Sequence, residues 1–221
     1  MSQAFNRVRK EIEIAVKAGG PDPKGNARLR IALQNAKSVN MPKDRVEAAI
    51  KRASSKDTTG YSEIVYEGYG PHAVAIMVEC ATDNPTRTVA NVRHLFRKFE
   101  GNLGSNGSIS FMFEHKALIK INRAAVSDID EFELDLIDFG LNELLYDDES
   151  IYIYTMFEDF GSMQKALEEK NLEVVSSEFQ WVPNNFKELS PEQSEDVTKL
   201  IDALEDDEDV QGVYHNVAQT E

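Results

Sequence analysis

The first 56 residues contain three short stretches in which apolar residues recur every three or four positions. This spacing is typical of one face of an amphipathic helix. The first stripe consists of Phe5, Val8, Ile12 and Val16, and the second of Leu29, Ala32, Leu33 and Ala36. Glycine and proline interrupt the periodicity at 19–21 and 40–42, as they do where helices end. We predict three helices, with Asp22 as N-cap of the second and Pro42 in the first turn of the third.

A polar linker over residues 54–62 separates these helices from a region with strand-like patterns. Residues 73–79 form an apolar run typical of a buried strand, and residues 109–113 alternate as a second strand. A helical apolar pattern lies between the two. A layered sheet needs a further helix and strand, and the chain offers these only at its end, at 197–204 and 210–217.

Residues 117–186 contain a complete set of strands and helices of their own. Apolar patterns predict strands at 118–121, 151–154 and 173–182, with helices near 128–139 and 161–170. Because this set interrupts the central unit, we interpret it as an inserted domain. The sequence therefore predicts a multidomain α+β protein, with an N-terminal helical bundle and two α+β domains of ferredoxin-like type. The predicted domains are 1–56, 57–116 plus 187–221, and 117–186.

Charge is distributed unevenly over these three parts. The formal net charge of the chain is −15, but residues 1–56 hold 13 Lys and Arg against 5 Asp and Glu, a net of +8. Residues 57–125 are neutral, and residues 126–221 carry 4 basic against 27 acidic side chains, a net of −23. A basic segment on an otherwise acidic chain indicates an end that faces a polyanion. A Lys/Arg-rich solvated helix face is the simpler alternative.

Apolar runs and cysteine content bear on the compartment. The longest apolar run, 73–78, ends at Glu79, which is too short to span a bilayer. The N-terminus shows no charged segment followed by an apolar one, so we expect no secretory signal. The single cysteine, Cys80, excludes an intramolecular disulfide and fits a reducing compartment. We expect a cytoplasmic protein without membrane contact.

Catalytic and metal-binding patterns are weak in this sequence. The four histidines are scattered, without the spacing that a metal site needs. Cys80 ends an apolar strand and is better explained as a buried structural thiol than as a nucleophile. The glycine-rich stretch 101–108 lacks the Lys-Ser/Thr pair of a phosphate-binding loop, and we interpret it as a helix-to-strand connection. We therefore expect no enzyme, no catalytic residue, no metal, no cofactor and no small-molecule substrate.

A polar cluster opens the helix that follows the strand at 73–79. Asp83 or Asn84 can cap this helix and Pro85 suits its first turn. A cation in the first turn is unfavourable because the helix dipole is positive there, yet Arg87 occupies it. Either a ligand anion or a carboxylate from elsewhere in the chain would explain it, and the sequence favours neither. The candidate anion site consists of Asn84, Arg87, Thr88 and Arg93.

Four separated motifs resemble one known family. They are GGPDPKGNARLRIALQNAKSVNMPKDRVEAAIKRAS, YEGYGPHAVAIMVECATDNPTRTVANVR, GSISFMF and EDDEDVQGVYHN. Together they are similar to the YebC family, whose relatives include the mitochondrial translational activator of cytochrome oxidase subunit one. Two features depart from the family pattern: only MSQA precedes Phe5 where a basic GHSKW-type segment is usual, and His72-Ala73 replaces the commoner glycine pair.

The resemblance implies a three-domain fold and a non-enzymatic role. Family members are described as probable DNA-binding transcriptional regulators, and others as ribosome-associated factors that ease synthesis through proline-rich stretches. We expect a gene-expression regulator that binds DNA or ribosomal RNA through its N-terminal helices, where Lys and Arg contact phosphates. The candidate residues are Arg28, Arg30, Lys37, Lys43, Arg45, Lys51 and Arg52. The alternative is a protein–protein adaptor that docks a basic partner through its acidic C-terminal half.

Overall fold

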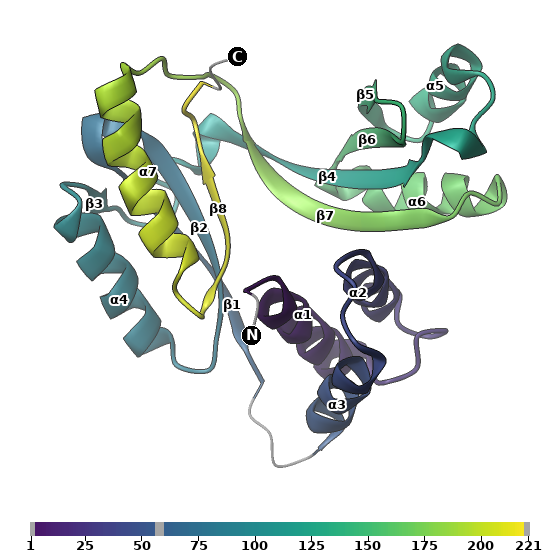
Figure 1. Cartoon of the computed structure of the whole chain (residues 1–221), viewed down its shortest axis with the longest axis horizontal. Helices are drawn as coiled ribbons and strands as arrows, with labels where there is room; N and C mark the ends of the chain where they lie inside the picture. Colours follow the sequence, from purple (N-terminus) through teal and green to yellow (C-terminus); the bar gives the residue numbers. More distant parts are fainter. Residues whose placement is uncertain (1–2, 56–59, 219–221) are drawn as a thin grey trace.

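The computed structural model describes residues 3–55 and 60–218 (Figure 1). Three helices come first, followed by two four-stranded sheets with helices packed on them. The N-terminal helices are α1 (Gln3–Gly19), α2 (Ala27–Ser38) and α3 (Lys43–Ser54). Their shared core contains the predicted stripes, with Ile12 and Leu29 fully buried. Part of the predicted linker, residues 56–59, lies outside the described residues.

The start of α2 differs from the prediction. Asn26, not Asp22, is its N-cap, and the Asn26 side chain accepts a hydrogen bond from the Leu29 amide at 3.0 Å. The same side chain donates to the carbonyl oxygens of Ala15 (2.7 Å) and Gly20 (2.9 Å). Asn26 therefore ties the end of α1 to the start of α2, a contact that local spacing does not reveal. The third helix also starts one residue later than predicted, with Pro42 as its N-cap.

The central sheet has the order β3-β1-β2-β8 and all its pairs are antiparallel. Its strands are β1 (Ser62–Tyr69), β2 (Ala75–Thr82), β3 (Asn102–Leu103) and β8 (Val210–His215). Helices α4 (Pro85–Lys98) and α7 (Pro191–Glu205) pack on one face of this sheet. Thus the last helix and strand of the chain complete the sheet begun at residue 62 (Figure 1). The strand predicted at 109–113 is wrong: Ser110–Met112 is a 3-10 helix, and the two-residue β3 pairs with β1 instead.

The second sheet has the order β5-β6-β4-β7. Its strands are β4 (Phe113–Asn122), β5 (Leu141–Tyr146), β6 (Ser150–Met156) and β7 (Val174–Pro183). Helices α5 (Ile129–Ile137) and α6 (Phe160–Glu169) cover one face. With its helices, this sheet follows the β-α-β-β-α-β order of a ferredoxin-like fold. The central sheet departs from that chain order because β1 and β2 are joined directly, as a hairpin.

Strand β4 belongs to both halves of the molecule. Phe113, at its start, packs with Ala75 and Met77 of the central sheet, whereas Ile119 and Ile121 lie in the core of the second sheet. The boundary predicted between residues 116 and 117 therefore falls inside a continuous strand. Figure 1 shows β4 and β7 running side by side from the central sheet into the second one.

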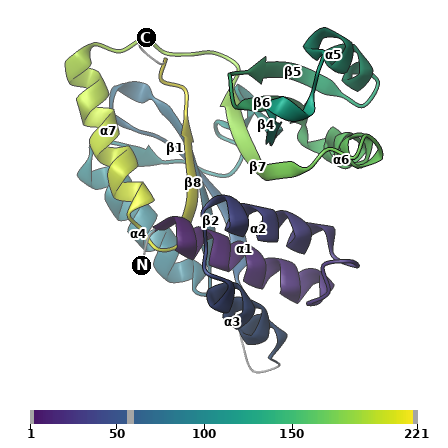
Figure 2. The same ribbon diagram turned by 45° about the vertical axis from the view of Figure 1, so that its right-hand side comes forward.

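Polar contacts from α2 and from the central sheet hold the second sheet in place. Asn35 of α2 accepts a hydrogen bond from the Ser177 amide at 3.1 Å and donates to its carbonyl oxygen at 2.9 Å, so one side chain pairs with the edge of β7. Both views place α2 alongside β7 (Figure 2). Trp181 of β7 donates to the Glu79 carboxylate of the central sheet at 2.8 Å. Burial raises the pKa of Glu79.

The turn between β1 and β2 contains two residues in left-handed backbone conformation. His72 has φ 57° and Ala73 has φ 56°. Glycine tolerates this region without a steric penalty, whereas residues with a Cβ atom do not. The conformation fits the glycine pair that the family resemblance leads us to expect at these positions. In the part of the chain that the structure describes, no helix is long and apolar enough to cross a membrane.

Candidate nucleic-acid interface

The seven cations predicted to contact nucleic acid divide into two groups. Those on α2 contact other parts of the protein, although the Lys37 side chain is itself 80% exposed. Arg28 forms an ion pair with Glu63 of β1, and Lys37 lies 2.9 Å from the Glu173 carboxylate, which precedes β7. Arg30 donates to the carbonyl oxygens of Pro23 (2.9 Å) and Lys24 (3.3 Å), so it braces the loop before its own helix.

The cations on α3 have a different environment. All four are exposed. Lys43 has a side chain 90% exposed, 3.7 Å from Glu47 of the same helix. The Arg45 guanidinium lies 6.0 Å from the centre of the Phe5 ring, and Arg52 lies 3.9 Å from the largely buried Glu13 carboxylate. Lys51 makes no ion pair with any residue in the described ranges. Helix α3 therefore places four exposed cations on one short helix, where solvent or a ligand can reach them.

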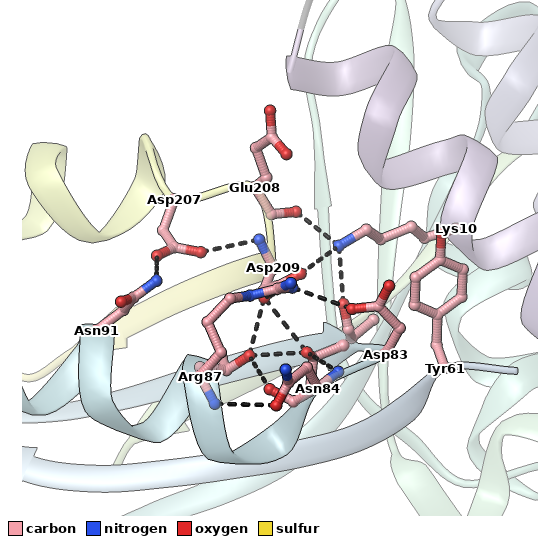
Figure 3. Close-up of polar contacts among 12 residues, drawn as sticks. Lys10, Tyr61, Asp83, Asn84, Arg87, Asn91, Asp207, Glu208 and Asp209 are labelled. Atoms are coloured by element: carbon pink, nitrogen blue, oxygen red, sulfur yellow. Dashed lines mark hydrogen bonds and ion pairs between the residues drawn. The ribbon is translucent and has the colours of Figure 1, made fainter. Parts of the chain in front are cut away.

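The start of α4 has the predicted cap and an internal partner for Arg87 (Figure 3). Asn84 accepts a hydrogen bond from the Arg87 amide at 3.1 Å. The Arg87 guanidinium lies 3.0 Å from Asp83 and 2.9 Å from Asp209, the residue before β8. Of the two explanations that the sequence left open, the structure therefore shows the carboxylate from elsewhere in the chain.

Asp209 is the centre of a buried polar cluster. One of its oxygens accepts hydrogen bonds from Thr88 (2.8 Å), Arg87 (2.9 Å) and Thr82 (3.2 Å). The other lies 3.1 Å from Lys10 Nζ of α1. Burial alone would raise the pKa of Asp209, but these hydrogen bonds and the nearby Lys10 charge lower it. Asp209 thus occupies the position beside Arg87 and Thr88 that the sequence left open for a ligand anion. The candidate anion site of Asn84, Arg87, Thr88 and Arg93 stays a prediction. Arg93 is exposed on α4.

The glycine-rich connection shows a second internal carboxylate. Glu67 of β1 is buried and accepts hydrogen bonds from the amides of Gly107 (2.7 Å), Ile109 (2.8 Å) and Ser110 (3.0 Å). The backbone donors that could have approached a phosphate thus bind a side chain of the protein itself. The loop has a structural role as a connection, as the sequence predicts.

Sequence reasoning missed Lys10, Asp209 and Glu67 as organising residues. Lys10 was one basic residue among thirteen, and Asp209 ends the acidic run at 205–209. The helical period of α1 offered no signal for Lys10, because residues two positions apart, such as Lys10 and Ile12, lie on different faces of a helix. Cys80 is buried as predicted, and burial raises the pKa of its thiol to about 12. Across residues 3–55 and 60–218, no group of three or more His, Cys, Asp or Glu side chains is placed to hold a metal ion.

Comparison with known proteins identifies the family. The model described as TACO1/YebC protein N-terminal domain matches residues 1–56, and that of the TACO1/YebC second and third domain matches residues 61–217. A "probable transcriptional regulatory protein" of Cytophaga hutchinsonii is 54% identical over 221 residues, covering 100% of this chain and 92% of that protein. A protein of the same name from Parabacteroides distasonis is 51% identical over 219 residues, covering 99% and 90%.

A solved structure agrees with this assignment. The crystal structure of a conserved hypothetical protein from Aquifex aeolicus superposes with a TM-score of 0.83 at 36% identity, covering 99% of this chain and 90% of that one. The names of the curated relatives support a regulatory role in the family. Family models that match both parts of the sequence, and relatives above 50% identity over its whole length, lead to one conclusion: the chain belongs to the TACO1/YebC family.

Proposed function

We propose that this protein is a non-enzymatic, cytoplasmic regulator of gene expression that binds nucleic acid through the outward face of α3. The observation that carries the proposal is the exposure of Lys43, Arg45, Lys51 and Arg52 on one short helix. Ion pairs at a surface contribute about 0–1 kcal/mol, so a phosphate replaces a partner such as Glu47 at little cost. Phosphate contacts of this kind give affinity without sequence information.

The cations of α2 have another role in this proposal. Arg28 and Lys37 pair with carboxylates of β1 and of the residue before β7, so they orient the helical bundle relative to the two sheets. Phosphate binding by Arg28 or Lys37 would break a contact between separate parts of the chain, whereas the Lys43–Glu47 pair lies within one helix. We therefore assign the nucleic-acid contacts to α3. The role of α2 is to hold the helical bundle, and with it α3, in a fixed orientation.

The charge distribution favours a compact nucleic acid over a long duplex. Residues 126–221 carry a net charge of −23, which repels phosphates approaching the two sheets. A duplex that wrapped around the molecule would meet this charge, whereas a folded RNA or a nucleoprotein surface can contact α3 alone. Ribosomal RNA fits this description. The names of the relatives favour transcription and thus DNA.

Salt titration of matched variants tests the surface. We expect the triple variant Lys43→Gln/Arg45→Gln/Lys51→Gln to bind a structured RNA and a duplex DNA more weakly. Its log–log salt slope should fall by about 0.7–0.9 per phosphate contact removed. The control is Arg93→Gln/Arg97→Gln/Lys98→Gln, which removes three exposed cations from α4. Equal losses in the two triple variants, with both folded by circular dichroism, would contradict a site on α3.

Binding measurements on the wild-type protein test whether RNA or DNA is the preferred partner. We expect tighter binding to a folded RNA than to a duplex DNA of equal charge at the same salt concentration. We also expect co-sedimentation with ribosomes in a sucrose gradient, lost in the α3 triple variant. Tighter binding to the duplex, with no ribosomal fraction, would assign the protein to DNA.

A further inference from the structure

A groove runs between the second sheet and the edge strand β8 of the central sheet. In β6, Ile151 and Ile153 are buried under α5 and α6, so Tyr152 and Tyr154 point to the opposite face, which no helix of the described chain covers. That face and β8 form the two sides of the groove. Its aromatic and apolar lining includes Leu145, Tyr154, Phe186 and Tyr214.

Two of these side chains are unusually exposed for their size. Phe186 is 62% exposed and Leu145 is 48% exposed, and they come from different parts of the chain. Single exposed apolar residues are common on protein surfaces, but these two line one groove, where one apolar side chain of a partner can contact both. Tyr154 lies across the strand pair from Glu143, which places a carboxylate beside an aromatic ring.

The groove is lined by one cation, Lys116, and one anion, Glu143, and of the two Glu143 is the exposed one. Its one lysine, Lys116, is largely covered and lies 3.0 Å from Glu114, so its charge is compensated within β4. Glu143 is exposed and forms no ion pair with residues of the described ranges. Burial raises the pKa of Tyr154, and the negative charges of Glu143 and Glu178 raise it further. Burial also raises the pKa of Tyr214, with Glu79 and Glu178 adding to the effect.

We propose that this groove binds an extended basic segment of a partner protein. An arginine or lysine side chain of that segment lies against the Tyr154 ring and pairs with Glu143. A neighbouring apolar side chain packs on Leu145 and Phe186. Aromatic rings attract cations through the negative charge of their faces, and a nearby carboxylate adds a direct ion pair.

The acidic surroundings of the groove favour a basic protein segment as its partner. The groove lies in the region of net charge −23, which draws basic segments and repels phosphates. The exposed cations of α3 have the opposite preference. The two surfaces are therefore complementary to the protein and the nucleic-acid components of one nucleoprotein. The groove does not depend on the function proposed for α3, and each surface is tested by its own ligand.

Peptide titration of the full-length protein tests this proposal. The probe is acetyl-Gly-Arg-Phe-Arg-Gly-amide, and its counterpart carries Glu in place of both Arg. We expect saturable binding of the arginine peptide, with amide shifts in nuclear magnetic resonance spectra at β5, β6 and β8, and none with the glutamate peptide. Raising the salt from about 50 mM to about 300 mM should weaken binding, because ion pairs at a surface are screened.

Matched variants locate the site. Glu143→Gln should weaken binding of the arginine peptide about fivefold, and Phe186→Ala should weaken it to a similar degree. The control is Glu133→Gln, which removes an exposed carboxylate from α5, on the helix-covered side of the sheet. Equal affinity of the two glutamine variants, or equal binding of the two peptides, would overturn the proposal. Shifts at these strands caused by an RNA oligonucleotide, with none caused by the arginine peptide, would assign the groove to nucleic acid and overturn it as well.

Discussion

Lys10 Nζ lies 3.1 Å from the Asp209 carboxylate, and the two side chains are only 5% and 8% exposed. The residues are 199 positions apart in the chain. The ammonium group also donates to the carbonyl oxygens of Glu208 (2.6 Å) and Ala81 (2.7 Å). A buried charge is tolerated only when it is paired and hydrogen-bonded, and these three oxygens meet that requirement. Lys10 thus fixes the helical bundle to the central sheet.

Removing this lysine should destabilise the protein strongly. Lys10→Met leaves two carbonyl groups and part of a carboxylate without their buried donor, and we expect a loss of about 3 kcal/mol in the free energy of unfolding. Urea denaturation followed by circular dichroism measures it. Lys24→Met, at an exposed position, is the matched control and should lie within about 0.5 kcal/mol of wild type. Similar values for the two variants would contradict a structural role for Lys10.

The acid dependence of stability should report on Asp209. Its pKa is lowered in the folded protein, so its charged form stabilises the fold above the ordinary aspartate pKa. This contribution is lost as the pH falls below about 4, through the lowered pKa. Asp209→Asn should therefore be less stable than wild type at neutral pH, and the difference should shrink in acid. Melting curves between neutral pH and pH of about 3 test this; a difference independent of pH would contradict it.

Arg87 should stabilise the protein without contacting nucleic acid. Arg87→Gln removes one of the two cations beside Asp209, so we expect a lower melting temperature. The decrease should be smaller than for Lys10→Met, because the Arg87 side chain is 50% exposed. Arg93→Gln, on the same helix, serves as control and should leave the melting temperature unchanged. If folded Arg87→Gln bound RNA or DNA more weakly than wild type, we would conclude instead that Arg87 contacts a phosphate of the nucleic acid.

The turn between β1 and β2 should gain stability from glycine. Ala73 is exposed and has φ 56°, so Ala73→Gly relieves a strained conformation without removing buried contacts. The gain is reduced by the greater freedom of glycine in the unfolded chain, which leaves about 0.5–1 kcal/mol. Ala48→Gly on the exposed face of α3 should instead cost about 1 kcal/mol. Urea midpoints that move in the same direction for both variants would contradict this.

Local patterns predicted most of the elements in this fold. The stripes of α1 and α2, the buried β2 and the helices α4 to α7 all follow from apolar spacing, because each element buries one face of its own. Asn84 was predicted as an alternative cap of α4, and the structure confirms it. The edge strands β3 and β5 were missed. Residues in edge strands are partly exposed and lack a clear alternation, so their pairing depends on the neighbouring strand.

The sequence by itself determined the three-part layout, the charge separation and the family, because these depend on composition and spacing within short segments. Only the tertiary structure decided which charged residues pair across the fold. Arg87 finds its carboxylate 122 positions away, and Lys37 finds Glu173 136 positions away. Contacts of this kind arise when distant elements pack together. The sequence shows which residues of a helix are charged. The packing of distant elements determines whether each charge pairs within the protein or is left for a ligand.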